Sequence, residues 1–297
     1  MNFKIKDSDL ILGSNSKEKI IVSFSGGKTS AYMSIHLKKF YSDKYEFIFI
    51  FANTGQECEE TLKFIDKCDK EFSLNVVWIE AVVNPQHGKG ITHKIVSFDT
   101  ASRNGEPFEA HIAKSGIPNA NKPQCSDRLK ALPIEHYKKI NNLIGIKHCI
   151  GIRKDEERRK SKYGQERYNL IYPLCDWFET DKQDVNDYWE DMPFTLELEE
   201  HQGNCKTCWK KSDKKLWLLA LEEPKKFDFM RKMENQYQHI KSNDNGVPRV
   251  FFRRNRGVDD IFNEIVNMNA EQLRHMIGYA YDENSGCSES CEAYSLE

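Results

Sequence analysis

A short stretch near the start of the chain combines glycines, hydroxyl side chains and a lysine, which together can bind an oxyanion. It consists of Ser23, Phe24, Ser25, Gly26, Gly27, Lys28, Thr29 and Ser30. An apolar run, residues 20–22, precedes it, and a helix-like segment, residues 31–40, follows it. Backbone N–H groups at the start of a helix have no internal partner, and glycines let an oxyanion approach them closely. The stretch therefore predicts a phosphate site, with an ordinary glycine turn as the alternative.

The spacing within this stretch excludes a Walker-type phosphate loop. Counting back from Lys28, the position at which a Walker loop needs its first glycine is occupied by Val22. The remaining possibility is a different phosphate loop that also joins a strand to a helix.

A second group of small polar residues, Asn53, Thr54, Gly55 and Glu57, follows another apolar run. The Glu57 carboxylate can orient a ribose hydroxyl or bind Mg²⁺. An acidic residue in the first turn of a helix also stabilises the helix dipole, so a purely structural role stays open.

A third segment places Cys125 close to two cationic side chains, Arg128 and Lys130. A guanidinium fork and an ammonium group suit phosphate or sulfate oxygens. A cysteine near cations has a lowered pKa and more thiolate, which makes it a candidate nucleophile. The alternatives are an inert buried thiol and a solvated basic helix face.

The chain has nine cysteines, and four of them form two closely spaced pairs. The first pair is Cys205 and Cys208 and the second is Cys287 and Cys291. Four thiolates suit either Zn²⁺ or a [4Fe–4S] cluster, and we favour the cluster slightly. A thioredoxin-like redox pair is less favoured because Cys205 does not follow the start of a βαβ unit. Apart from Cys125, the remaining thiols lie in apolar settings and are predicted to be core residues: Cys58, Cys68, Cys149 and Cys175.

The elements that must position these residues alternate between strand-like and helix-like segments, which predicts an α/β fold with a mostly parallel, doubly wound sheet. Strands are expected at residues 20–24, 46–52, 75–80 and 147–152, and helices at 29–41, 57–72 and 134–141. Residues 84–122 show weak periodicity and are expected to form a long connection, either a flap or a disordered insertion. Helical patterns dominate after residue 181. We therefore predict a nucleotide-binding domain, residues 1–180, and a helical extension, residues 181–297, with a cysteine-rich metal site.

The ordered motifs resemble those of the phosphoadenosine phosphosulfate (PAPS) reductase family, within the adenine nucleotide alpha-hydrolase superfamily and especially its phage- and plasmid-type members. The resemblance covers about residues 20–189. Its members share the pyrophosphate loop S-G-G-x-x-S, here Ser25 to Ser30, which we call the PP-loop. The segment from Cys125 to Lys130 resembles the family's cysteine-then-basic segment, and Gly151-Ile152-Arg153 resembles its G-x-R stretch.

The resemblance implies which residues act on the substrate. Catalysis would rest on Lys28, Cys125 and Arg153. The nucleotide would be held by Ser23, Ser25, Gly26, Gly27, Lys28, Thr29, Ser30, Asn53, Thr54, Gly55, Glu57, Arg128, Lys130, Gly151 and Arg153. Adenosine phosphosulfate reductases hold an iron–sulfur cluster through a cysteine pair at the position of Cys125 and a later C-x-x-C. Ser126 replaces the second cysteine of that first pair, so Cys125 is an alternative ligand beside the four cysteines above.

Two reactions fit the resemblance. Either ATP, with Mg²⁺, is cleaved to AMP and pyrophosphate while a substrate is adenylated for sulfur transfer, or a sulfonucleotide such as PAPS is reduced with release of sulfite. The reductase tail E-C-G-x-H is incomplete here, because Cys287 is followed by Ser288 and Glu289. This departure favours the reaction that uses ATP. A nucleotide-binding subunit without catalytic activity is the third possibility.

The composition excludes some classes of protein and of partner. With 39% hydrophobic and 30% charged residues and a net charge of −2, the chain is not a generally basic nucleic-acid binder. No apolar run is long enough for a membrane span, and the start lacks a signal peptide, so we expect a cytoplasmic protein without a membrane partner. DNA or tRNA, partner proteins and a second copy of the chain remain possible partners.

Residues 250–257 mix aromatics with arginines, which suits a nucleic-acid contact or a solvated loop. The histidines show no ligand spacing and are expected to be structural or exposed.

Overall fold

The structure is a computed structural model that describes residues 17–203, 205–242, 246–279 and 293–294. Its centre is a six-stranded sheet of order β4-β3-β2-β1-β5-β6, in which every neighbouring pair is parallel except β3 and β4. The strands are β1 (Glu18–Ser23), β2 (Tyr45–Asn53), β3 (Val77–Val83), β4 (Ile91–Val96), β5 (His148–Cys149) and β6 (Leu170–Ile171). The predicted α/β fold with a mostly parallel sheet is confirmed.

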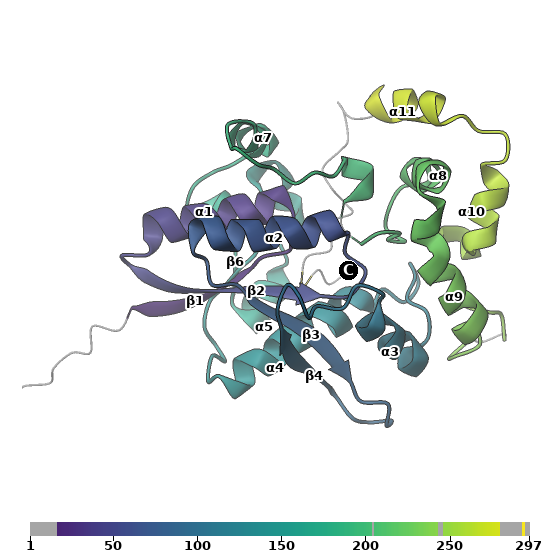
Figure 1. Cartoon of the computed structure of the whole chain (residues 1–297). Coiled ribbons are helices and arrows are strands. Elements are labelled where there is room, and N and C mark those ends of the chain that lie inside the picture. The colour runs from purple at the N-terminus through teal and green to yellow at the C-terminus, as the bar shows by residue number, and fades with distance from the viewer. Residues whose placement is uncertain (1–16, 204, 243–245, 280–292, 295–297) are drawn as a thin grey trace, which may run out of the picture.

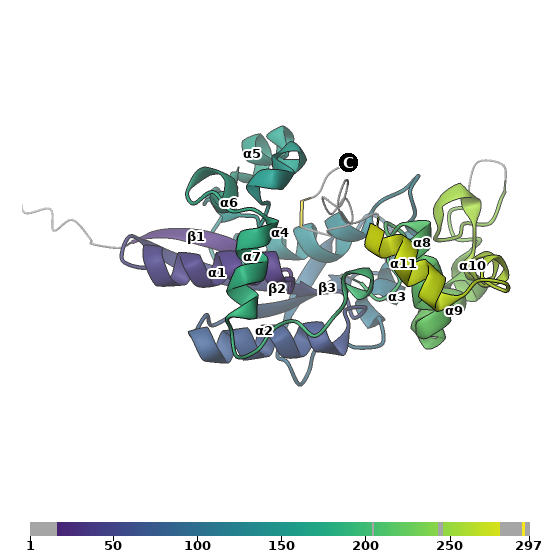
Figure 2. The same ribbon diagram turned by 90° about the horizontal axis from the view of Figure 1, so that it is seen from above.

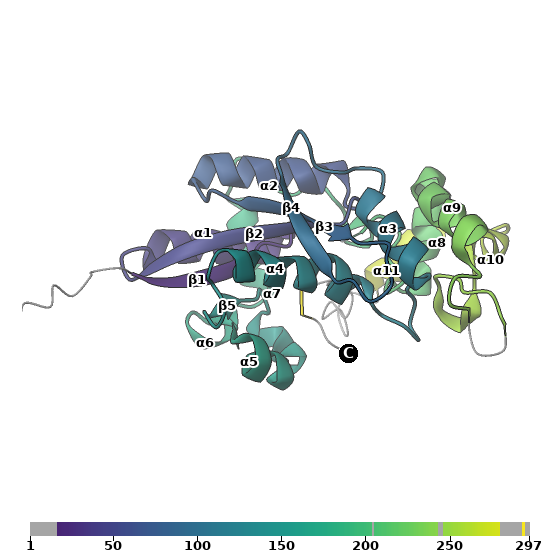
Figure 3. The ribbon, with the colours of Figure 1, turned by 90° about the horizontal axis from the view of Figure 1, so that it is seen from below.

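Helices cover both faces of this sheet (Figures 1 and 3). The helices around the sheet are α1 (Lys28–Tyr41), α2 (Glu59–Phe72), α3 (Glu106–Ser115), α4 (Leu132–Ile140), α5 (Lys162–Tyr168), α6 (Pro173–Asp176) and α7 (Lys182–Glu190). Successive buried residues of β1 face opposite sides of the sheet, because Ile20 and Val22 pack under α1, α2 and α7 while Ile21 packs toward α4. Figure 2 shows α7 crossing α1, and the Trp189 Nε1 donates to the Lys28 carbonyl at 3.0 Å.

The region between residues 84 and 122 is more regular than its sequence indicates. It contains β4, which pairs antiparallel with β3, and the helix α3. The expectation of one long connection was wrong because Gly88 and Gly90 lie in the turn between β3 and β4 and do not interrupt a flap. The half-exposed β4 also lacks the continuous apolar run that identifies the inner strands.

The helical extension contains α8 (Asp213–Glu222), α9 (Asp228–Tyr237), α10 (Val258–Glu264) and α11 (Ala270–Tyr279), as the patterns after residue 181 predict. Its core joins Phe227, Met230 and Phe251 to Phe108 and Ile112 of α3, so the extension packs on the end of the sheet domain. The domain boundary at residue 180 stays a prediction. None of the helices in the described ranges is both long and apolar enough to cross a membrane.

Candidate functional site

The PP-loop is closed by hydrogen bonds among its own hydroxyl groups. Ser25 donates from its N and its Oγ to Ser30 Oγ at 3.1 and 2.9 Å, and Ser30 Oγ donates to the Gly27 carbonyl at 3.0 Å. Gly26 has a φ of 86°, and a Cβ there would lie 2.6 Å from Thr61 Cγ2. The loop is therefore preformed, and the position of Gly26 requires a glycine.

The start of α1 has no acidic side chain that would compete with a bound anion for its N–H groups. The first turn of α1 contains no acidic residue. Its N-cap residue, Gly27, provides no side-chain hydrogen bond to the N–H groups of that turn. In the described part of the chain, the one atom within 4 Å of a Cβ at Gly27 would be Ser25 Oγ, at 3.9 Å, so these residues leave space beside this backbone. N–H groups in the first turn of a helix have no intrahelical partner, and together with the helix dipole and the half-buried Lys28 they favour an anion at this point.

Arg153 brings the G-x-R stretch to the PP-loop. Its Nη1 donates to Thr29 Oγ1 at 3.2 Å, and its Nε and Nη2 donate to the two carboxylate oxygens of Asp155, each at 2.9 Å. Its Nη2 also lies 3.3 Å from Glu156 Oε1. A Cβ at Gly151 would lie 3.3 Å from the Ser30 Cα, so the two loops are in close contact. The structure thus brings together two motifs that are far apart in the sequence.

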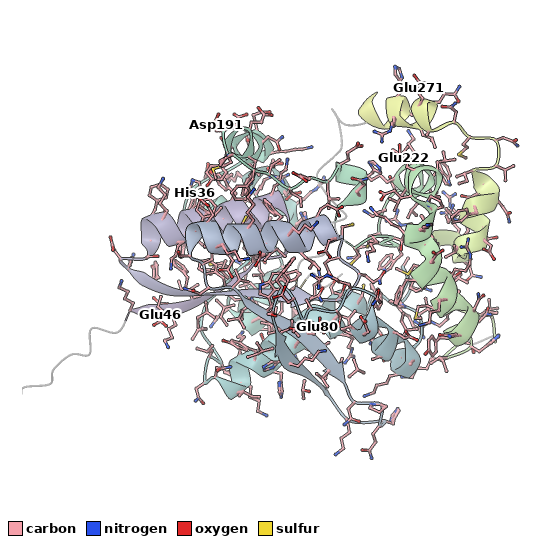
Figure 4. All side chains as sticks on the ribbon, viewed as in Figure 1. His36, Glu46, Glu80, Asp191, Glu222 and Glu271 are labelled. Carbon is pink, nitrogen blue, oxygen red and sulfur yellow. The ribbon has the colours of Figure 1, made fainter. Side chains whose placement is uncertain are left out.

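The side chains of Asn53 and Glu57 shape the loop after β2. Asn53 Nδ2 donates to Glu80 Oε1 at 2.7 Å, and Asn53 Oδ1 accepts from Gly55 N at 3.1 Å. Figure 4 marks Glu80, a fully buried residue of β3. The Glu57 carboxylate accepts from Thr54 N and Thr54 Oγ1, both at 2.9 Å. These contacts support the structural alternative for Glu57, and its role at a nucleotide stays a prediction.

The loop with Cys205 and Cys208 docks directly on the loop after β2. Cys205 forms a β-bridge with Glu57, and Lys206 N donates to the Gln56 carbonyl at 2.8 Å. Cys205 Sγ lies 3.9 Å from Thr54 Oγ1. Both cysteines are buried, with 8% and 6% of their surface exposed. The cysteine pair therefore stands beside a loop that the sequence assigns to the nucleotide site.

The predicted metal ligands are described only in part. Cys287 and Cys291 lie outside the described residues. Among the residues that are described, no group of three or more His, Cys, Asp or Glu side chains could hold a metal ion. The described cysteines thus do not supply a complete site.

The segment after Cys125 contains the π-helical turn η1 (Asp127–Ala131), which leads into α4. Single π-turns often occur at functional sites. Lys130 is 8% exposed, and it lines a small cavity beside the PP-loop. Arg128 is half exposed and pairs with Asp127 at 3.3 Å. Cys125 is partly exposed and packs against the core of the helical extension.

The cysteines predicted to be core residues are buried: Cys58, Cys68, Cys149 and Cys175. Burial raises the pKa of their thiols, to about 12 for Cys68 and about 11 for Cys175. Such thiols are poor nucleophiles at neutral pH.

His148 is a site residue that the sequence did not indicate. Its Nε2 lies 2.8 Å from Ser23 Oγ, and both residues are buried. Burial lowers the pKa of His148 well below its usual range, so the imidazole is neutral. The histidine was missed because a single histidine within a strand-like run has no ligand spacing. Its place on β5, next to β1, follows from the order of the strands in the sheet, which no signal in the sequence gave.

Two of the arginines in residues 250–257 make ion pairs and hydrogen bonds within the helical extension. Arg256 pairs with Asp213 and Glu264, and Arg253 Nη2 donates to the Lys210 carbonyl at 2.9 Å. The side chain of Arg254 is 80% exposed. A nucleic-acid contact through this loop stays a prediction.

The fold and the preformed phosphate loop define an α/β protein of the PP-loop class. The model of the phosphoadenosine phosphosulfate reductase domain matches residues 19–195. The chain belongs to this family, which places it among enzymes that use a nucleotide.

Two curated relatives extend the comparison. The chain is 27% identical over 285 residues to the nin region protein ORF290 of Escherichia phage lambda, covering 92% of this chain and 94% of that protein. It is 27% identical over 173 residues to the protein MJ0973 of Methanocaldococcus jannaschii, covering 56% of this chain and 35% of that protein. Among solved structures, the U34-tRNA thiolase NcsA from Methanococcus maripaludis with its [4Fe-4S] cluster aligns with a TM-score of 0.36 and 15% identity, over 77% of this chain and 75% of that one.

Proposed function

We propose that this protein uses ATP to adenylate a substrate that then receives sulfur, with release of pyrophosphate and AMP. The observation that carries the proposal is the docking of the Cys205 loop on residues 54–57, beside a preformed phosphate loop. An anion site and a pair of thiols within one edge of the sheet suit a reaction that joins nucleotide chemistry to sulfur chemistry.

The residues of the loop have distinct roles in this proposal. A substrate oxygen attacks the α-phosphorus of ATP, the bond between that phosphorus and the bridging oxygen breaks, and pyrophosphate leaves with the electron pair. The N–H groups at the start of α1 and the Lys28 ammonium stabilise the charge on pyrophosphate. Arg153, held beside Thr29 and paired with Asp155 and Glu156, adds a further N–H donor for the phosphate oxygens. A sulfur nucleophile then displaces AMP from the activated substrate. Mg²⁺ is expected with ATP.

Reduction of a sulfonucleotide is the second candidate, because the family is named for that reaction. Incubation with ATP and, separately, with PAPS distinguishes the two. Release of pyrophosphate from ATP supports adenylation, and release of sulfite from PAPS with a thiol reductant supports reduction. Tight binding of either nucleotide without any product would instead indicate an accessory subunit.

The cysteines define the metal part of the proposal. Cys205 and Cys208 would supply two ligands, and Cys125, Cys287 or Cys291 the others. We propose a [4Fe–4S] cluster, for which anaerobically purified protein should be brown and contain about four irons per chain. A colourless protein with one zinc per chain would contradict the cluster and support the alternative.

The partners follow from this chemistry. An adenine nucleotide is the first, and a nucleic acid, DNA or tRNA, is a candidate sulfur acceptor. Thiolation assays with each nucleic acid in the presence of ATP test which of them is the sulfur acceptor. We also propose a cytoplasmic location and a homo-oligomer.

A further inference from the structure

Ala293 and Tyr294 pack beside the PP-loop although they are distant from it in the sequence. Tyr294 is 2% exposed and Ala293 is 6% exposed. Ala293 lines the small cavity beside the loop together with Ser23, Ser25 and Lys130. Residues close to the end of the chain therefore form part of the wall of the candidate nucleotide site.

Tyr294 is held by contacts from several elements. Its hydroxyl donates to Glu135 of α4, and its ring centre lies 4.7 Å from that of Tyr168 and 5.0 Å from that of His148. The His148 contact is edge-on, with an angle of 85° between the rings. Tyr294 has a φ of 68°, a conformation that a non-glycine residue keeps only where its surroundings fix it. A buried tyrosine with these contacts is a firm anchor.

His148 connects this anchor to the PP-loop. Its Nε2 contacts Ser23 Oγ at 2.8 Å, whereas its Nδ1 is buried without a hydrogen-bond partner in the described part of the chain. Rotation of the imidazole ring about its Cβ–Cγ bond would break this one hydrogen bond. The ring of Tyr294, packed at a right angle to the imidazole, blocks that rotation.

We infer that Tyr294 is a positioning residue of the nucleotide site, which acts through His148 to fix Ser23 and thereby the PP-loop. The inference rests on the proposed nucleotide site and adds the C-terminal residues to it. Ser23 ends β1, directly before the loop that would bind phosphate, so the hydrogen bond of its side chain to His148 helps to hold the strand end from which that loop starts. The site is then complete only when Tyr294 is seated.

Amide hydrogen exchange at residues 23–27 tests this coupling without any nucleotide. Tyr294→Ala and His148→Leu should each raise exchange there, and His148→Gln, which keeps a polar group within reach of Ser23, should restore protection. Tyr172→Phe is the matched control, because it removes the hydroxyl of another buried tyrosine, which accepts from Ser161 N. Wild-type exchange in Tyr294→Ala overturns the inference, whether or not His148→Leu folds.

ATP binding by calorimetry separates the inference from the proposed function. Tyr294→Ala should weaken ATP binding about tenfold, the effect of losing roughly one buried hydrogen bond. Adding His148→Leu to that variant should cause little further loss, since both changes act on one contact. Unchanged binding, or tighter binding because Tyr294 blocks the site, overturns the inference and leaves the proposed function intact. If the wild type binds neither ATP nor PAPS, the proposed function fails, and the exchange experiment alone decides the inference.

Discussion

Arg153 joins the two candidate phosphate loops through its hydrogen bond to Thr29. We predict that Arg153→Ala lowers nucleotide turnover by about a hundredfold, because one preorganised donor for a developing charge is worth about that much. Arg153→Lys should recover only part of the rate, since an ammonium cannot contact Thr29 and Asp155 together. Steady-state pyrophosphate release checks both. Arg167→Ala, which removes an arginine paired with Tyr163, should keep the wild-type rate.

Gly26 is the residue on which the shape of the PP-loop depends most directly. Gly26→Ala places a Cβ 2.6 Å from Thr61 Cγ2 and 2.9 Å from Ile65 Cδ1, in a residue whose φ is 86°. We expect a loss of about 1–3 kcal/mol in the free energy of unfolding, together with loss of nucleotide binding. Denaturant unfolding and ATP titration measure the two effects. Wild-type stability in Gly26→Ala would show that α2 can move away from the loop.

At the scale of elements, the loop with Cys205 and Cys208 is held by its contacts with the loop after β2. We predict that Cys205→Ser and Cys208→Ser each lower the metal content per chain, because each removes a thiolate from the proposed site. Metal analysis and absorbance spectra provide the measurement. Cys68→Ala is the control, because this buried thiol of α2 has a raised pKa and should leave the metal content unchanged. Equal metal content in all three variants would place the metal elsewhere.

Glu234 of α9 connects three segments of the helical extension. Its carboxyl group accepts from Phe251 N at 3.1 Å and from Val258 N at 2.8 Å, and burial raises its pKa from 4.5 to about 7. In the pH range between these values the folded state holds the proton more tightly than the unfolded state. The stabilisation is complete below the unfolded pKa and is lost as the pH rises through the folded pKa.

We therefore predict that the free energy of unfolding falls by up to about 3 kcal/mol through this one group as the pH rises from about 4.5 to about 7. Glu234→Gln should flatten that part of the profile, because glutamine does not titrate. Urea unfolding at several pH values gives the comparison, and parallel profiles for the two proteins would assign the pH dependence to other groups.

At the scale of the whole molecule, Gly105 lies where the helical extension meets the loop after β2. A Cβ at Gly105 would lie 2.4 Å from Phe229 Cε2 of α9 and 2.6 Å from Gln56 Nε2. We predict that Gly105→Ala destabilises the protein by about 1–3 kcal/mol and loosens the docking of the extension. Thermal unfolding and limited proteolysis of residues 205–279 test this. Gly90→Ala, in which none of the described atoms lies within 4 Å of the added carbon, should have little effect on either.

Local patterns in the sequence predicted much of the fold, because a buried strand and an amphipathic helix each leave a periodic mark. The inner strands, the helices after residue 181 and the turn at Gly26 all fall in this class. The edge strand β4 and the helix α3 do not, since one face of β4 is exposed and glycines surround both elements. The predicted roles of the site residues in catalysis and nucleotide binding stay predictions.

The sequence by itself determined the PP-loop, because its glycines, hydroxyls and lysine are adjacent and act through local backbone geometry. Only the tertiary structure decided what surrounds that loop. The contacts of Glu57 with Cys205 and of Ser23 with His148 join residues that lie far apart along the chain. They arise from the pairing of β1 with β5 and from the packing of the extension on α3, and side-chain packing of that kind leaves no periodic mark in the sequence.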